Sequence, residues 1–301
     1  MTILGDTRNI PLSESIANSL NQKVKYPEIH DFVDGEFRIR LLTEVTGDDV
    51  FVIKSFASPV ERNLLEFLFT VDACRRVGAG RVFGICPYLP YMRADHVFRS
   101  GEAVPLEVMS DIFDSLKLEE MWTIDPHSIK LPEMFRTEVV DENTVGLFGD
   151  KIKELSQDLS KVSVVSPDMG GIRRIRLLAE YLNVPYVTVQ KDRDLETGKT
   201  VVAKFEGEVR EEVYLVDDII SSGGTMVNAA EALLENGAKR ATVMATHAVF
   251  AQEAKENLQR SSIEKVYVTD SIEVDEDVKF AKLEILSLGE QICKYLRDLS
   301  R

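Results

Sequence analysis

The chain has 301 residues, of which 44% are hydrophobic and 29% are charged, and its formal net charge is −15. This length accommodates two domains of ordinary size or one large domain. The acidic balance argues against nucleic acid and anionic membranes as partners, although a few clustered cations can still bind phosphate.

Membrane insertion and secretion are not expected. No apolar run approaches the roughly 18 residues needed to span a bilayer. The first residues, MTILGDTRN, lack the basic region of a secretory signal. Cys74, Cys86 and Cys293 are scattered without metal-binding spacing, as is typical of reduced thiols. We therefore expect a cytoplasmic protein.

Short β-branched segments alternate with amphipathic helical patterns along the chain. In the first half we predict a strand over 50–54, a helix over 63–77 and a strand over 81–86. In the second half the predicted strands are 162–165, 185–189 and 241–245, and the predicted helices are 173–182 and 226–235.

This alternation predicts an α/β fold with mainly parallel sheets and helices on both faces. The pattern restarts near residue 145, after a polar stretch over 141–144 that we interpret as a loop. We therefore predict two domains of similar plan, 1–145 and 146–301. The possibility that the final helix returns to the N-terminal domain stays open.

The stretch 213–225, VYLVDDIISSGGT, contains two adjacent carboxylates and a pair of glycines. Asp217 and Asp218 follow an apolar strand, and ligands collect at the carboxyl ends of strands in open α/β sheets. Gly223, Gly224 and Thr225 then open a helix, whose free amides suit a phosphate. The two acids could hold the hydroxyls of a ribose, directly or through Mg²⁺. The alternative is a tight turn with solvated aspartates.

A second carboxylate, Asp168, follows the strand 162–165 and precedes two glycines. One or two carboxylates together with substrate phosphates are a usual Mg²⁺ site. The alternative is that Asp168 caps the helix that begins near Ile172.

Two cations, Lys191 and Arg193, come after the strand predicted to end at Val189, and a polar loop over 194–199 follows them. They could be solvated loop charges. Alternatively, the loop closes and brings both cations to a transferring phosphate, because positioning and charge neutralisation dominate phosphoryl transfer.

Several motifs together resemble one family. The stretch 213–225 is similar to the ribose-5-phosphate loop of the phosphoribosyltransferase superfamily. Other motifs, in family order, resemble segments of the ribose-phosphate pyrophosphokinases. FVDGE (32–36) resembles the adenine loop, PYLPYMRAD (87–95) the ATP-binding segment, and IDPH (124–127) the segment with the metal-binding histidine. VSPDMGG (165–171) resembles the metal- and ribose-binding turn, and KDR (191–193) the start of the catalytic loop.

This resemblance implies two phosphoribosyltransferase-like domains and a transferase that moves the diphosphoryl group of MgATP to the anomeric hydroxyl of ribose 5-phosphate, with Mg²⁺ as cofactor. It implies a catalytic role for Lys191 and Arg193 and metal binding for His127 and Asp168. The residues implied to bind ATP are Phe32, Asp34, Glu36, Arg93, Asp95 and Arg99. The residues implied to bind the ribose phosphate are Asp217, Asp218, Ser221, Ser222, Gly223, Gly224 and Thr225. Without the resemblance, a lone histidine after a strand such as His127 is more often a hydrogen-bonded structural residue than a metal ligand. The family's adenine loop reaches a neighbouring subunit, so a homo-oligomer, dimer or hexamer, is also implied.

The chain departs from the family at a few positions. Ala94 stands where glutamine is usual, His96 and Val97 where basic residues are common, and Ser221-Ser222 where Asp-Thr is usual. Three alternatives therefore stay open: a larger acceptor such as ADP-ribose in NAD salvage, a catalytically silent regulatory homologue, and a single-step phosphoribosyltransferase.

Overall fold

The computed structural model describes residues 1–193, 200–251 and 253–299, and for residues 191–193 and 200–203 it describes the backbone alone. The chain divides into two compact units. Unit 1 contains Met1–Glu142, Ser271–Glu273 and Ser287–Arg301, and unit 2 contains Asn143–Asp270 and Val274–Leu286.

Unit 1 is built on a six-stranded sheet in the order β2-β1-β5-β6-β7-β8, in which every pair is parallel. The strands are β1 (Thr2–Leu4), β2 (Val24–Lys25), β5 (Asp49–Ile53), β6 (Arg81–Ile85), β7 (Glu120–Ile124) and β8 (Glu138–Glu142). The helices are α1 (Ile10–Ser19), α2 (Val60–Arg76), α3 (Pro105–Ser115), α4 (Leu131–Met134) and α9 (Gly289–Leu299).

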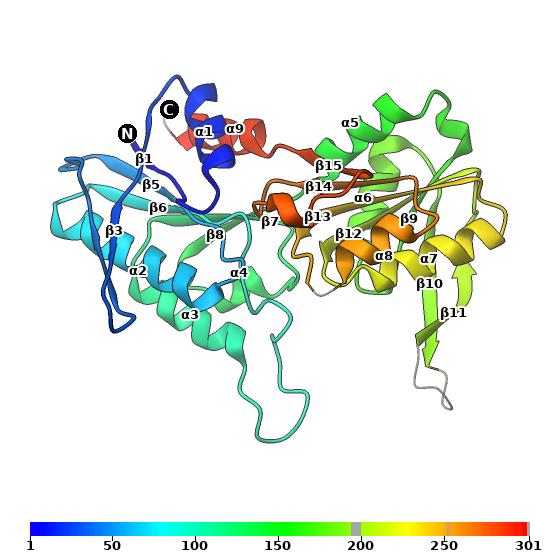
Figure 1. Cartoon of the computed structure of the whole chain (residues 1–301), viewed down its shortest axis with the longest axis horizontal. Coiled ribbons are helices and arrows are strands. Elements are labelled where there is room, and N and C mark those ends of the chain that lie inside the picture. The colour runs from blue at the N-terminus through cyan, green and yellow to red at the C-terminus, as the bar shows by residue number, and fades with distance from the viewer. Residues whose placement is uncertain (194–199, 252, 300–301) are drawn as a thin grey trace. The chain divides into compact units, whose positions relative to one another are not determined.

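Helices cover both faces of this sheet (Figure 1). On one face, α2 and α3 bury an aromatic cluster in which Phe67 lies 5.4 Å from Phe56 and 5.5 Å from Phe113, measured between ring centroids. On the other face α1 packs beside α9, where the Arg297 guanidinium donates to the carbonyl oxygen of Ser19 at 2.7 Å. The sequence favours α2 because Glu61 lies in its first turn and Arg75 and Arg76 in its last, which complements the helix dipole.

A separate antiparallel hairpin, β3 (Glu28–Asp31) and β4 (Phe37–Arg40), also belongs to unit 1. In the described residues it shares no strand pairing with the six-stranded sheet. Its attachment therefore depends on side chains.

Unit 2 is built on a seven-stranded sheet in the order β11-β10-β9-β12-β13-β14-β15, parallel except for the β10–β11 pair. The strands are β9 (Val162–Ser166), β10 (Tyr186–Arg193), β11 (Thr200–Glu206), β12 (Glu212–Ile220), β13 (Arg240–Ala248), β14 (Lys265–Thr269) and β15 (Leu283–Leu286). The helices are α5 (Val145–Leu155), α6 (Ile172–Leu182), α7 (Gly224–Glu235) and α8 (Ala254–Arg260), with short 3-10 helices at Leu159–Lys161 and Glu276–Val278.

Alternate residues of the central strand β12 enter two different cores. Val213 and Leu215 pack with α7 and α8, whereas Tyr214 and Val216 pack with α5 and α6. A strand buried on both faces reads as a continuous apolar run, which is the reason why this strand was detectable in the sequence. The prediction of an α/β fold with mainly parallel, helix-flanked sheets is confirmed.

Several boundaries differ from the predictions, among them the ends of β10 and β8. The strand expected to end at Val189 continues to Arg193, because it pairs with β11 through Lys191↔Val202 and Arg193↔Thr200, with a register shift between Gln190 and Lys191. The polar stretch 141–144 is not wholly a loop, since Asp141 and Glu142 end β8, paired with Thr123 and Ile124. In both places the strand continues through polar residues because a neighbouring strand forms backbone hydrogen bonds with them. The predicted polar loop over 194–199 lies outside the described residues.

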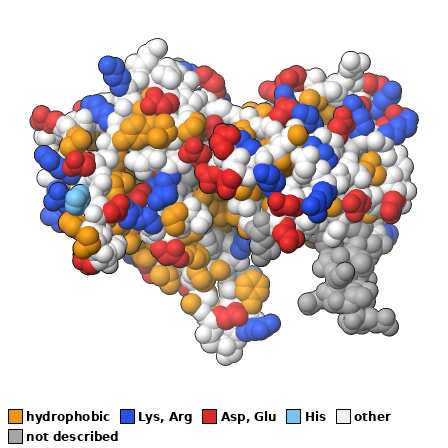
Figure 2. All heavy atoms as spheres, viewed as in Figure 1, with side chains coloured by type: hydrophobic (Ala, Val, Ile, Leu, Met, Phe, Trp, Pro, Cys, Tyr) orange, Lys and Arg blue, Asp and Glu red, His pale blue; other side chains and the backbone are white. Residues whose placement is uncertain are grey.

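The visible surface carries cationic and anionic side chains interspersed, so the acidic balance does not produce one uniform field on this face (Figure 2). Among the described residues, no helix is long and apolar enough to cross a bilayer.

The aromatic cluster of unit 1 gives a stability prediction. Phe67 is 1% exposed and Leu65, on the same helix, is 40% exposed. Phe67→Ala should lower the free energy of unfolding by about 3–5 kcal/mol, because it leaves a cavity beside Phe56 and Phe113. Leu65→Ala, the matched control, should change it by no more than about 0.5 kcal/mol. Urea unfolding followed by circular dichroism measures both, and equal effects would contradict this description of the core.

Candidate functional site

The two adjacent carboxylates of unit 2 lie beyond the end of a neighbouring strand. On one side of β12 the pairing with β9 ends at Leu215↔Val165, whereas on the other side the pairing with β13 continues to Ile220↔Ala248. Asp217 and Asp218 are therefore still part of β12, not of the turn after it. Their position past β9 places them at the carboxyl edge of the sheet, where ligands bind in such folds.

The compensating cation is Arg174, from the first turn of α6. Its guanidinium lies 3.4 Å from Asp217 Oδ1 and 3.8 Å from Asp218 Oδ2. Each carboxylate also accepts a backbone hydrogen bond, Asp217 from the amide of Asp218 at 2.9 Å and Asp218 from the amide of Ile219 at 3.0 Å. Sequence reasoning missed Arg174. The signal was a basic residue just after Gly170-Gly171 at a helix start, but the sequence could not show that it faces β12.

The electrostatics of the pair leave room for a ligand. The side chains of Asp217 and Asp218 are only 16% and 7% exposed. Burial, followed by the neighbouring Asp218 carboxylate, raises the pKa of Asp217 well above its usual value, and Arg174 offsets this only in part. Negative charge is thus held here at a cost, and a hydroxyl donor or a cation arriving at this edge would relieve it.

Asp168 lies at the end of the adjacent strand β9, in a turn fixed by local hydrogen bonds. Ser166 Oγ donates to the carbonyl oxygen of Asp168 at 2.6 Å, and the amide of Gly170 donates to Asp168 Oδ1 at 2.9 Å. The turn requires Gly171, because a Cβ there would lie 2.5 Å from Ser166 Oγ and 3.8 Å from Asp217 Oδ1. The N-cap of α6 is Gly171 and not Asp168, so the alternative capping role is wrong.

The loop from Ser221 to Thr225 leads into α7. Gly223 is the N-cap with φ of 77°, a backbone conformation that favours glycine, and a Cβ there would lie 3.1 Å from Leu258 Cγ. The carbonyl of Ser221 accepts from the amide of Ala251 at 3.1 Å, and that of Ser222 accepts from Asn257 Nδ2 at 3.0 Å. The loop is thereby anchored, and the first amides of α7 form the anion-binding end of a helix dipole.

Lys191 and Arg193 lie on β10, which pairs with β9 up to Thr188↔Ser166 and then extends beyond the carboxyl edge of the sheet in the ribbon with β11 (Figure 1). Their side chains lie outside the described part of the structure.

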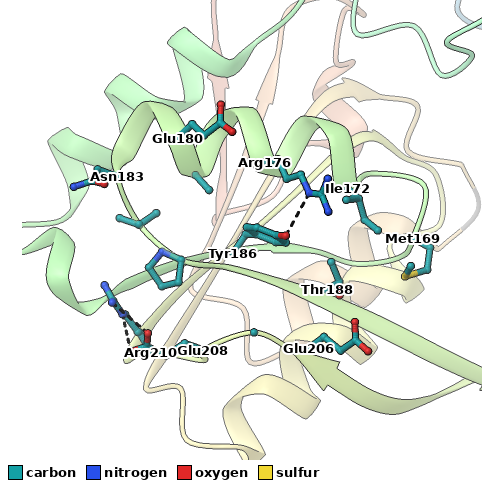
Figure 3. A pocket seen from close by; sticks show the side chains of 14 residues that line it. Met169, Ile172, Arg176, Glu180, Asn183, Tyr186, Thr188, Glu206, Glu208 and Arg210 are labelled. Atoms are coloured by element: carbon teal, nitrogen blue, oxygen red, sulfur yellow. Dashed lines mark hydrogen bonds and ion pairs between the residues drawn. The ribbon is translucent and has the colours of Figure 1, made fainter.

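An open groove of about 1100 Å³ runs between α6 and the β10–β11 ribbon (Figure 3). It begins at Met169, next to Asp168, and Arg176 Nε donates to Tyr186 Oη at 3.3 Å on its wall. Among the described residues that line it, none is a predicted site residue.

In unit 1, the hairpin tip presents an exposed aromatic ring and two carboxylates. Phe32, Asp34 and Glu36 are all exposed, and the amide of Phe32 donates to the carbonyl of Glu36 at 2.8 Å. The amide of Glu36 donates to Asp34 Oδ1 at 3.1 Å. The side chains of His30 and Arg38 lie against Phe32, at 4.9 Å and 5.9 Å from its ring centroid. Such a tip can stack on a planar ligand and accept hydrogen bonds from it.

The segment after β6 brings Asp95 to the segment that contains His127. Ser128 Oγ donates to Asp95 Oδ2 at 2.7 Å, and His96 Nδ1 lies 2.6 Å from Asp95 Oδ1. The hydrogen bonds from Ser128 and then His96 lower the pKa of Asp95. Asp95 thus ties two segments together, a contact that the sequence could not reveal. Arg93 and Arg99 are exposed on the same segment.

His127 is exposed just after β7. The chain turns there at Asp125, which has φ of 41° and donates its amide to the carbonyl of Glu142 at 2.9 Å. A non-glycine residue in this region of φ is uncommon and concentrates at functional turns.

No group of three or more metal-binding side chains occurs within the described ranges. The residues present still fit Mg²⁺, because this ion typically takes one or two protein carboxylates and completes its shell with water and substrate phosphates. Asp168, half-buried at the sheet edge, is a donor of that kind.

Comparison with known proteins gives a consistent match. The chain matches the model of the N-terminal domain of ribose phosphate pyrophosphokinase over residues 1–116 and that of the phosphoribosyl synthetase-associated domain over residues 130–300. It is 34% identical over 295 residues to a ribose-phosphate pyrophosphokinase of Haemophilus ducreyi, covering 96% of this chain and 92% of the relative. It is 33% identical over 305 residues to the ribose-phosphate pyrophosphokinase of Thermotoga maritima, covering 100% of this chain and 96% of the relative.

The fold agrees with these sequence matches. The phosphoribosylpyrophosphate synthetase of Mycobacterium smegmatis superposes with a TM-score of 0.90 at 28% identity, covering 99% of this chain and 98% of that one. Because relatives above 30% identity cover nearly all of the chain and the same architecture is found in a solved structure, the chain belongs to the ribose-phosphate pyrophosphokinase family.

Proposed function

We propose that this protein transfers the β,γ-diphosphoryl group of MgATP to the anomeric hydroxyl of ribose 5-phosphate, giving phosphoribosyl pyrophosphate and AMP. The observation that carries the proposal is the buried Asp217–Asp218 pair next to the glycine-capped start of α7, in a chain whose relatives are named ribose-phosphate pyrophosphokinases.

The acceptor is bound at the carboxyl edge of the unit 2 sheet. Asp217 and Asp218 accept hydrogen bonds from the ribose 2- and 3-hydroxyls, and Arg174 fixes both carboxylates in place. The amides from Ser221 to Thr225 grip the 5-phosphate, with the positive end of the α7 dipole directed at it. The anomeric oxygen is thereby oriented for attack.

Asp168 and His127 are the proposed protein ligands of Mg²⁺. When bound, the ion neutralises the charge of the donor phosphates. Ser166 and the amide of Gly170 orient Asp168 for this role.

Lys191 and Arg193 stabilise the transferring group. The anomeric oxygen forms its bond to the β-phosphorus as the bond from that phosphorus to the oxygen kept by AMP breaks, and the hydroxyl proton passes to solvent. Negative charge spreads over the equatorial oxygens during this displacement, so fixed cations accelerate it.

The nucleotide is bound by unit 1 residues. Phe32 stacks on the adenine, Asp34 and Glu36 accept hydrogen bonds at the hairpin tip, and Arg93 and Arg99 contact the phosphates. Asp95 contributes to this site through its contact with Ser128. We further propose a homo-oligomer, a dimer or hexamer, in which the hairpin tip serves a neighbouring subunit.

The reaction itself gives the first test. Incubation with MgATP and ribose 5-phosphate should yield phosphoribosyl pyrophosphate and AMP in equal amounts, identified by mass spectrometry, and a chelator of Mg²⁺ should abolish both. Release of ADP would indicate transfer of a single phosphoryl group and contradict the proposal.

Substitution of the acidic pair tests the acceptor site. Asp217→Asn and Asp218→Asn should weaken ribose 5-phosphate binding by a factor on the order of 10 to 100 and ATP binding much less, because each removes a charged acceptor of a ribose hydroxyl. Calorimetric titration of each substrate separates the two effects, and Glu231→Gln on the exposed face of α7 is the control. Equal weakening of both substrates would argue for a shared metal site instead.

Substitution of the β10 cations tests the catalytic step. Lys191→Ala and Arg193→Ala should each lower kcat by a factor on the order of 10² to 10³, the scale for one lost transition-state contact. Equilibrium binding of ATP should change much less. Lys204→Ala, on the adjacent strand and paired with Gln190, should retain wild-type kcat. A kcat near wild type in either of the first two variants would refute this role.

A further inference from the structure

The β3–β4 hairpin is attached to unit 1 by side chains that contact α2. Phe37 of β4 lies 5.1 Å from Phe69 of α2, measured between ring centroids. Ile29 and Ile39 line a small cavity together with Phe67 and Thr70 of the same helix. Since no strand pairing joins the hairpin to the six-stranded sheet in the described residues, side-chain contacts such as those with α2 hold the hairpin in place.

Arg62 of α2 makes the polar part of this attachment. Its Nη2 lies 2.6 Å from Asp31 Oδ1 on β3, and its guanidinium lies over the Phe37 ring of β4, 3.7 Å from the centroid. One side chain therefore contacts both strands of the hairpin. Asp31 directly precedes Phe32, the first residue of the tip.

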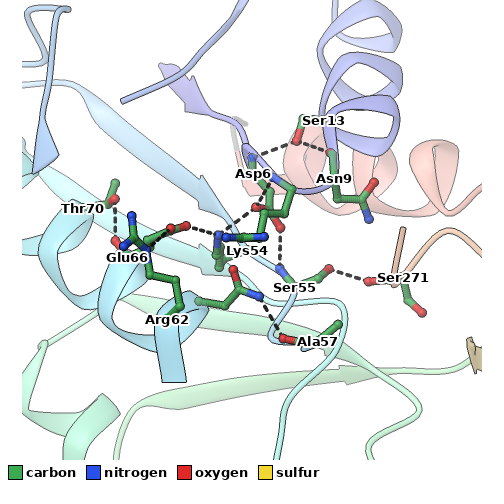
Figure 4. A network of polar contacts seen from close by, with 12 residues as sticks. Asp6, Asn9, Ser13, Lys54, Ser55, Ala57, Arg62, Glu66, Thr70 and Ser271 are labelled. Carbon is green, nitrogen blue, oxygen red and sulfur yellow. Dashed lines mark hydrogen bonds and ion pairs between the residues drawn. The ribbon is translucent and has the colours of Figure 1, made fainter. Parts of the chain in front are cut away.

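The guanidinium of Arg62 is itself held by a buried ion-pair chain. Its Nε donates to Glu66 Oε1 at 2.7 Å, Lys54 Nζ donates to Glu66 Oε2 at 2.7 Å, and Lys54 also donates to Asp6 Oδ1 at 2.9 Å (Figure 4). The side chains of Lys54, Glu66 and Asp6 are 5% exposed or less. Asp6 in turn accepts from the amide of Ser55, at the end of β5, at 3.0 Å.

Each ion in this chain has an oppositely charged partner. Burial alone would raise the pKa of Glu66, but the hydrogen bonds from Lys54 and Arg62 outweigh it and the pKa lies below its usual value. Glu66 is therefore ionised and held between Lys54 and Arg62, and its contact with Arg62 Nε directs the other end of the guanidinium toward Asp31 on the hairpin. A planar guanidinium that bridges two carboxylates through different nitrogens fixes direction as well as distance.

We propose that Arg62 is a positioning residue for the nucleotide site, which orients the hairpin tip that carries Phe32, Asp34 and Glu36. It acts through Asp31 and Phe37 and does not touch ATP. This inference rests on the proposed function, because it assigns the tip to ATP. The chemistry is specific to arginine, since a lysine provides one point charge and no planar face for Phe37.

Kinetics of Arg62→Met test the proposal. This variant leaves Lys54 on Glu66, so the buried carboxylate keeps a cation and the fold is retained. The KM for ATP should rise about tenfold or more, the scale of one lost hydrogen bond between charged groups. The KM for ribose 5-phosphate and kcat at saturating ATP should stay within about twofold, since neither depends directly on the tip. Arg62→Lys should restore part of the loss.

Matched variants separate positioning from a structural effect. Asp31→Asn, at an exposed carboxylate, should raise the KM for ATP in the same direction, and the double variant should be no worse than the larger single effect. Arg76→Met removes the exposed Arg76–Asp72 pair of the same helix and should leave both KM values unchanged.

The outcomes decide between the possibilities. A KM for ATP within twofold of wild type in Arg62→Met would overturn the inference. A lower kcat together with higher KM values for both substrates and a lower unfolding midpoint would also overturn it, because it would indicate a general structural effect. An inactive wild-type protein would instead refute the proposed function. In that case calorimetric titration of ATP into wild type, Arg62→Met and Arg76→Met decides whether Arg62 supports nucleotide binding, and equal affinities would overturn its role.

Discussion

The chemistry of unit 2 depends on holding two adjacent carboxylates at a buried sheet edge. Asp217 and Asp218 each accept a hydrogen bond from the backbone amide of the next residue, and both lie near the Arg174 guanidinium. These contacts keep the pair in place, and Arg174 offsets only in part the rise in the pKa of Asp217 that burial and the Asp218 carboxylate cause. Glycine is needed at 171 because a Cβ there would lie 2.5 Å from Ser166 Oγ, and it is favoured at 223 because φ is 77° at the start of α7.

Unit 1 solves a similar problem in the opposite way. Lys54 and Arg62 enclose Glu66, and Lys54 also neutralises Asp6, so the buried charges there are paired. Breaking such a pair leaves a buried charge uncompensated, which is strongly unfavourable. The chain of ion pairs is therefore suited to fix the direction of a side chain, and it ends at Asp31 on the hairpin.

The sequence predicted the fold class well because the central strands are buried on both faces. Val213–Val216 forms one apolar run, which predicted the strand, and the helix after it was found close to its observed bounds. The end of the strand was missed, because β12 continues through Asp217 and Asp218 to Ile220. The end of β10 was missed because Lys191 and Arg193 are polar and their strand is defined by an antiparallel partner. The predicted ends of the strands were enough to place Asp168, Asp217 and the α7 loop at one edge of the sheet. The contact of Arg174 with Asp217 and the Asp95–Ser128 hydrogen bond could not be predicted, because they depend on side-chain directions that periodicity does not specify.

The contrast between the two charge clusters bears on which one binds a ligand. In the unit 1 cluster the pKa of Glu66 is lowered, so ionisation is already stabilised by protein cations and an added cation or hydroxyl would gain little. At the unit 2 edge the pKa of Asp217 is raised, so each hydrogen bond or cation supplied by a ligand stabilises the ionised pair. A ligand that brings hydrogen-bond donors or a cation to this edge would offset part of the free-energy cost of burying Asp217 and Asp218 together, and this favours the unit 2 edge over the unit 1 cluster as the proposed binding site.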